Sequence, residues 1–176
     1  MNASCSVWKQ GAIEVTKLTV NNGTLNAIGT GAGIDVLSEM TVRGGSVTAL
    51  AKNDEEHYVG IRASNRESGK TIKITIDDGM VDAEGYCGIG TIESHETENE
   101  PVALVFTVNG GYVRATGANS NSDRAAVYGG CEGSTLTING GTLETSGQCR
   151  PIAFWCNDDT VEAEAVVMLA PHMVLR

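Results

Sequence analysis

The hydrophobic pattern of this 176-residue chain is a short phrase that returns five times. Each copy consists of an apolar residue, Thr, Val or Ile, two corner residues and Gly, and the copies begin at Leu18, Met40, Ile74, Phe106 and Leu136. The intervals between them are 22, 34, 32 and 30 residues. Repetition at this spacing is typical of stacked units that cannot bury an apolar face alone.

One repeat shows how the pattern predicts geometry. In residues 136–139, apolar and polar residues alternate, as in a strand with one buried face, so Leu136 and Ile138 are expected to point inward. Asn139 and the two glycines after it predict a corner, because Asn and Gly tolerate left-handed backbone angles. Residues 142–145 then predict a second strand with Leu143 inside.

Every repeat continues into a third apolar stretch. These stretches are Ala32–Ile34, Val59–Ile61, Cys87–Ile89, Ala125–Val127 and Pro151–Ile152. No helical periodicity separates the units, so the crossover helices of an ordinary parallel sheet are missing. The pattern predicts an all-β chain that folds as a right-handed parallel β-helix, a β-solenoid of about five coils with three short strands each.

The prediction covers one domain, 1–176, with repeat coils over 12–156 and terminal caps at 1–11 and 157–176. An antiparallel sandwich of hairpins is the alternative, because Asn-Gly is also a hairpin signal. One interior file distinguishes the two folds, since a β-helix stacks these residues directly over each other: Val20, Val42, Ile76, Val108 and Ile138.

Stacking at about 4.8 Å also predicts columns on the outside. The outward threonines of the first strands form one column: Thr19, Thr41, Thr75, Thr107 and Thr137. The first corner residues form another: Asn21, Arg43, Asp77, Asn109 and Asn139. We interpret both as structural ladders.

A third column predicts a ligand site. Alternation places Tyr58, Tyr86 and Arg124 on the outside of consecutive coils, three residues before the Ile or Val of the third stretch. Two exposed aromatic faces and a charged donor are what a sugar ring requires. Trp155 would extend this platform. The alternative is that the aromatic side chains only protect the sheet surface.

The net charge argues against several classes of partner. The chain carries a formal charge of −10, which disfavours nucleic acid and anionic lipid. It also lacks the roughly 20 consecutive apolar residues that span a bilayer, so no membrane insertion is expected.

Residues 93–100 contain four carboxylates and no Lys or Arg. We therefore consider a weak calcium site there, against solvated charge that keeps sheet edges apart. No other cofactor is expected.

Catalytic residues are not predicted. Asp77 and Asp78 are adjacent carboxylates, but Asp78 occupies a corner position that Gly fills in three other repeats. The three histidines lack a Ser or Cys partner that spacing would identify. Cys131 and Cys156 fall on consecutive coils, where they are either bridged or adjacent thiols, and Cys87 is expected in the core.

The segments 136–147 and 85–90 resemble the glycine-rich repeats of bacterial cell-surface proteins. Those proteins resemble the pectin lyase-like β-helix superfamily and are often carbohydrate-binding or adhesin-like. The resemblance implies a noncatalytic binding or spacer domain at the cell surface, with a polysaccharide as ligand. A fragment of a polysaccharide lyase or hydrolase remains an alternative, as does a structural stalk that self-associates through the solenoid ends.

Overall fold

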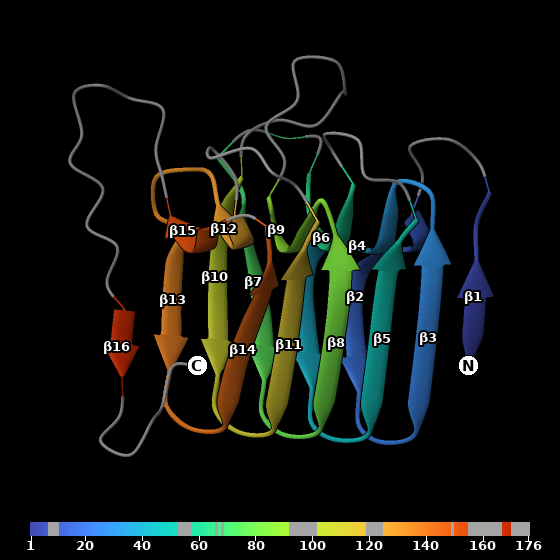
Figure 1. Cartoon of the computed structure of the whole chain (residues 1–176), viewed down its shortest axis with the longest axis horizontal. Helices are drawn as coiled ribbons and strands as arrows, with labels where there is room; N and C mark the ends of the chain where they lie inside the picture. Colours follow the sequence, from blue (N-terminus) through green and yellow to red (C-terminus); the bar gives the residue numbers. More distant parts are fainter. Residues whose placement is uncertain are drawn as a thin grey trace.

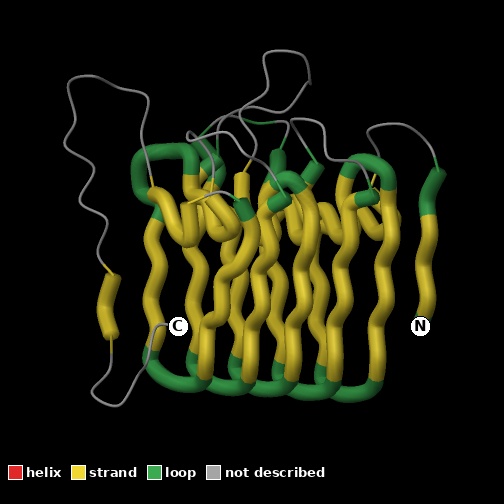
Figure 2. Tube along the Cα trace, viewed as in Figure 1, coloured by secondary structure: helices red, strands yellow, loops and turns green. Residues whose placement is uncertain are grey.

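The chain winds in successive coils whose strands pair only in parallel (Figure 1). The computed structural model describes residues 1–6, 11–52, 58–65, 67, 69–91, 102–118, 125–148, 150–154 and 167–169. Within these residues there are strands and loops but no helix, as Figure 2 shows, and hence no helix suited to crossing a membrane. The parallel β-helix prediction is confirmed, and the antiparallel sandwich is wrong.

One side of the solenoid is a six-stranded sheet, here called sheet A, which faces the viewer in Figure 1. It contains β1 (Asn2–Ser4), β3 (Thr24–Gly29), β5 (Ser46–Ala51), β8 (Met80–Gly85), β11 (Tyr112–Gly117) and β14 (Thr142–Gly147). Each strand is one coil further along the chain than its neighbour. Residues 2–4, expected in a terminal cap, therefore extend sheet A.

The other two sides belong to one ten-stranded sheet, sheet B. Its strands are β2 (Gly11–Val20), β4 (Ala32–Val42), β6 (Val59–Ala63), β7 (Thr71–Ile76), β9 (Cys87–Thr91), β10 (Ala103–Val108), β12 (Ala125–Gly129), β13 (Thr135–Ile138), β15 (Arg150–Phe154) and β16 (Val167–Leu169). Strand β4 pairs with both β6 and β7 and so continues around a corner.

Three short strands per coil are therefore found only from the third coil on. Before that, the third strand of one coil and the first strand of the next form a single long strand. These long strands are β2, of 10 residues, and β4, of 11 residues. The reason is the length of the intervening chain: seven residues, 64–70, separate β6 from β7, whereas β4 passes the same corner with only a register shift.

The interior consists of stacked aliphatic files. Val20, Val42, Ile76, Val108 and Ile138 lie in register on adjacent strands, with exposures of 8% for Val20 and 0% for the other four. Leu136 and Leu143, predicted to point inward, are each 1% exposed. Burying these branched side chains without gaps is the main source of stability in such a coil.

The tight corners along the lower edge of Figure 1 depend on glycine. The last corner residue has positive φ in all five repeats: Gly23, Gly45, Gly79, Gly111 and Gly141. At Gly79, where φ is 93°, a Cβ would also lie 2.6 Å from the Gly45 carbonyl oxygen of the preceding coil. The Asp78 carboxylate accepts a hydrogen bond from the Gly79 N–H at 2.7 Å, which confirms its role as a turn residue.

The corner column forms a hydrogen-bonded ladder. Asn139 Nδ2 donates to Asn109 Oδ1 at 2.8 Å, and Asn109 Nδ2 donates to Asp77 Oδ1 at 2.8 Å. Separately, Arg43 Nη1 donates to Asn21 Oδ1 at 3.4 Å. The predicted threonine column is also in register. Both columns thus follow the coil spacing.

Candidate ligand-binding face

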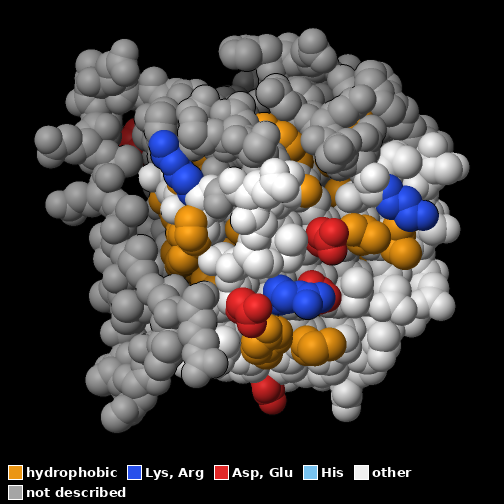
Figure 3. Space-filling model, in the orientation of Figure 1, with side chains coloured by type: hydrophobic (Ala, Val, Ile, Leu, Met, Phe, Trp, Pro, Cys, Tyr) orange, Lys and Arg blue, Asp and Glu red, His pale blue; other side chains and the backbone are white. Residues whose placement is uncertain are grey.

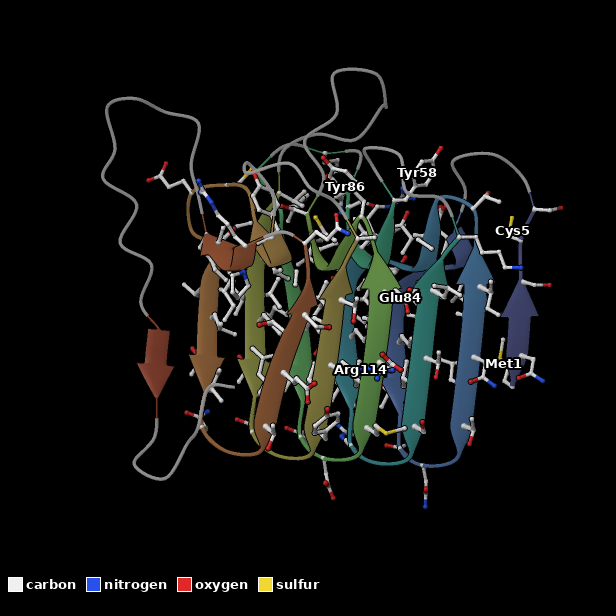
Figure 4. All side chains as sticks on the ribbon, in the orientation of Figure 1. Met1, Cys5, Tyr58, Glu84, Tyr86 and Arg114 are labelled. Atoms are coloured by element: carbon white, nitrogen blue, oxygen red, sulfur yellow. The ribbon has the colours of Figure 1, made fainter. Side chains whose placement is uncertain are left out.

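The predicted tyrosine platform is wrong in one essential respect, because the rings are not exposed. Tyr58 is 1% and Tyr86 7% exposed. Figure 4 labels both at the corner between sheet A and sheet B, away from Arg114 and Glu84 on the front of sheet A. Arg124 and Trp155 lie outside the described residues.

The two tyrosines are buried because this flank carries a second hydrophobic cluster, separate from the main core. Its members are Ala51, Tyr58, Val59, Tyr86, Cys87, Ala125 and Tyr128. Cys87 is accordingly buried, as expected, but belongs to this outer cluster. Strict strand alternation predicts exposure here, and only the three-dimensional arrangement shows that the flank is covered.

A buried ion pair joins two strands of sheet B. Arg62 and Asp35 pair across β6 and β4, with side chains 7% and 4% exposed, and Ser64 Oγ donates to Asp35. Among the described residues, Arg62 Nε has no hydrogen-bond partner. The two buried charges therefore neutralise each other.

The proposed calcium loop, residues 93–100, lies outside the described residues, as does Cys156, the expected neighbour of half-buried Cys131. In the part of the chain that the structure describes, no group of three or more His, Cys, Asp or Glu side chains could hold a metal ion.

The outward side of sheet A carries a different cluster, which the sequence patterns did not identify as a site. Each strand presents three outward positions, and register places the equivalents of successive coils side by side. The first two coils present uncharged residues, such as Thr24 and Ser46. The third to fifth coils instead present Met80, Asp82, Glu84, Tyr112, Arg114 and Glu144.

Tyr112 and Met80 form an apolar strip across two coils. They are register partners on β11 and β8, and Met80 is 45% exposed while Tyr112 is half-buried. The Tyr112 hydroxyl donates to Glu144 Oε2 on β14, in the next coil. The ring is thus held by its hydroxyl, which reduces the entropy that a ligand would have to remove on binding.

Arg114 lies beside this strip, between two carboxylates. It is the register partner of Asp82 on one side and of Glu144 on the other. Arg114 Nε donates to Asp82 Oδ1 at 2.9 Å, and a second guanidinium nitrogen donates to Asp82 Oδ2. Figure 3 shows a basic group between acidic groups with apolar side chains alongside.

Two pKa values reflect these contacts. The hydrogen bond to Glu144 raises the pKa of Tyr112, with smaller contributions from desolvation and from the Glu144 charge. The hydrogen bond to Asp82, and then the Asp82 charge, raise the pKa of Arg114. At neutral pH the face therefore presents a neutral phenol that donates to Glu144 and a permanently charged guanidinium.

One signal in the sequence points to this face. After the corner glycine, three of the five repeats place Thr or Ser, whereas Met80 and Tyr112 occupy that position in the third and fourth repeats. Large side chains at an outward position in two consecutive coils create an exposed strip. Whether this strip can form a binding site depends on the charged residues two positions further along each strand. Only the register between coils shows that these charged residues lie side by side.

A family model described as Beta helix repeat matches residues 18–35. The match covers most of the first coil, from the end of β2 through the corner and β3 into β4. The chain is a parallel β-helix. No curated protein and no solved structure matches it. The similarity concerns the residues that form the corner and core of the β-helix, and none of the outward cluster on sheet A lies within it.

Proposed function

We propose that this β-helix binds a polysaccharide on the outward face of sheet A and acts as a noncatalytic binding or spacer domain. The observation that carries the proposal is the Met80–Tyr112 strip beside the Asp82–Arg114–Glu144 column. An apolar ring face with adjacent charged hydrogen-bonding groups suits a sugar, which presents an apolar C–H face and hydroxyls at its edge.

The flat surface suits a chain rather than a single sugar. Neighbouring coils lie about 4.8 Å apart, so the outward positions offer a regular series of contacts along the solenoid axis. Thr116 and Ser146 continue the polar surface, with their hydroxyl oxygens 3.0 Å apart. The resemblance of the repeats to those of bacterial surface proteins supports display outside the cell.

Affinity electrophoresis and a glycan array test the proposal with three variants. Tyr112→Ala removes the ring, and we expect roughly tenfold weaker binding. Tyr112→Phe keeps the ring and should bind more tightly than Tyr112→Ala. Lys73→Ala, on an exposed position of β7 in sheet B, is the matched control and should bind like wild type. Absence of glycan binding by the wild type, or equal binding by Tyr112→Ala, would contradict the proposal.

The same cluster also bears on the catalytic alternative, because Asp82 and Glu144 flank Arg114. Both carboxylates already accept hydrogen bonds, from Arg114 and Tyr112 respectively. Incubation with each bound glycan, followed by analysis of released oligosaccharides, distinguishes the two functions. Product that disappears in Glu144→Gln would favour a lyase or hydrolase over a binding domain.

A further inference from the structure

The chain contains three Asn-Gly dipeptides, all in solenoid corners: Asn22-Gly23, Asn109-Gly110 and Asn139-Gly140. In this dipeptide the glycine nitrogen can attack the asparagine side-chain carbonyl carbon, because no Cβ hinders the approach. The three sites are not equivalent. Asn109 and Asn139 occupy the first corner position, whereas Asn22 occupies the second, one residue beyond the ladder position of Asn21.

At Asn22 the reacting groups are already close. The Gly23 N–H donates a hydrogen bond to Asn22 Oδ1 at 2.7 Å, so the glycine nitrogen faces the side-chain amide group that it would attack. Asn22 is exposed, and Gly23 has φ of 87° with no atom within 4 Å of the place a Cβ would occupy. This corner joins β2 to β3 (Figure 1), so no preceding corner stacks on it among the described residues.

At Asn109 and Asn139, the side-chain amide and the N–H of the following glycine form hydrogen bonds with other residues. Both side-chain nitrogens donate in the amide ladder, each at 2.8 Å. The Gly110 N–H donates to the Ile76 carbonyl and the Gly140 N–H to the Val108 carbonyl, each at 3.4 Å. The preceding coil also crowds both glycines, because a Cβ at either one would lie 2.5 Å from a backbone oxygen.

We propose that Asn22 is a site of spontaneous deamidation that the fold leaves open, while the ladder protects Asn109 and Asn139. The Gly23 nitrogen loses its proton to solvent and forms a bond to Asn22 Cγ. The Cγ–Nδ2 bond breaks, and Nδ2 takes up a proton and leaves as ammonia. Water then opens the succinimide to aspartate or isoaspartate, which adds one negative charge.

The aspartate product fits the corner. Asp78 occupies the equivalent position of the third coil and accepts the same hydrogen bond from Gly79, also at 2.7 Å. The isoaspartate product instead adds a carbon to the backbone of the corner. The two products therefore differ in whether the entry into β3 keeps its geometry.

The test follows the full-length protein in ¹⁸O-labelled water at mildly alkaline pH, by peptide mapping with mass spectrometry, with and without urea. In urea all three sites should react at similar rates. In the folded protein Asn22 should keep a rate close to its unfolded one, and Asn109 and Asn139 should react at least tenfold more slowly. Asn22→Gln, the control, should lose the fast phase. Protection of Asn22 equal to that of the other two would overturn the proposal.

Discussion

Arg114 on β11 donates two hydrogen bonds to Asp82, its register partner on β8 in the preceding coil. Arg114 is 48% and Asp82 25% exposed, so solvent screens the ion pair. The two-point geometry fixes the guanidinium plane beside the Met80–Tyr112 strip. The contact therefore positions a group on the proposed binding face more than it stabilises the fold.

A double-mutant cycle on Arg114 and Asp82 measures how much their ion pair contributes to the stability of the fold. We expect a coupling free energy below about 1 kcal/mol in urea unfolding, decreasing as salt is added. Arg114→Lys keeps the charge but loses the two-point geometry, so it should weaken glycan binding more than it lowers stability. A large coupling energy that is insensitive to salt would contradict this assignment.

The raised pKa of Tyr112 predicts a loss of stability in alkali. Its folded-state pKa lies above the ordinary value of 10.0, chiefly because of the hydrogen bond to Glu144. The contribution is therefore fully present below pH 10 and is lost as the pH rises through the folded-state pKa. The difference in unfolding free energy between wild type and Tyr112→Phe, measured by urea unfolding from pH 8 to pH 11, should stay constant until the pH approaches about 10 and decline above it.

Glu144→Gln provides the matched control for Tyr112. It removes the charge that favours the neutral phenol, so phenolate absorbance should show Tyr112 ionising at lower pH than in wild type. An unchanged titration curve would show that, in solution, Glu144 does not accept a hydrogen bond from the Tyr112 hydroxyl.

The buried pair of Arg62 and Asp35 predicts strong asymmetry between single and double substitutions. Arg62→Met leaves the Asp35 carboxylate buried without its cation and should cost about 3–5 kcal/mol in unfolding free energy. Arg62→Met combined with Asp35→Leu should recover most of that loss, because no charge is then left buried. Additive costs in the double variant would argue that the two residues do not interact.

The corner glycines predict a difference between two alanine substitutions. Gly79→Ala suffers both an unfavourable φ and a clash with the Gly45 carbonyl, whereas Gly23→Ala suffers the unfavourable φ alone. The φ penalty is about 1–2 kcal/mol, so Gly23→Ala should cost about that much and Gly79→Ala clearly more. Thermal unfolding followed by circular dichroism compares them, and equal costs would mean that the coil relaxes freely at the third corner.

Much of the fold could be predicted from the sequence because its repeat is local and strict. The alternation in Leu136 and Ile138 indicates which residues are inside, and the corner glycines indicate where the chain turns. The fused strands β2 and β4 were not predicted, since the repeat pattern does not show that these two strands keep pairing through that corner across a register shift, without the seven-residue segment that separates β6 from β7.

The candidate site was much less predictable. Tyr58 and Tyr86 follow the same period as the exposed positions, yet a second cluster buries them. Tyr112, Arg114 and Glu144 were passed over, because in the sequence Glu144 lies 30 residues beyond its register partner Arg114. A period identifies equivalent positions but not the chemistry that neighbouring coils bring together.

The sequence by itself determined the solenoid, its corners and its aliphatic interior, because those properties follow from residues that are close together in the chain and recur in each repeat. Only the tertiary structure decided which outward residues are accessible and which charges meet. The exposure of a side chain depends on what packs over it, and a contact between coils depends on the register of their strands. Both depend on segments that are far apart in the sequence.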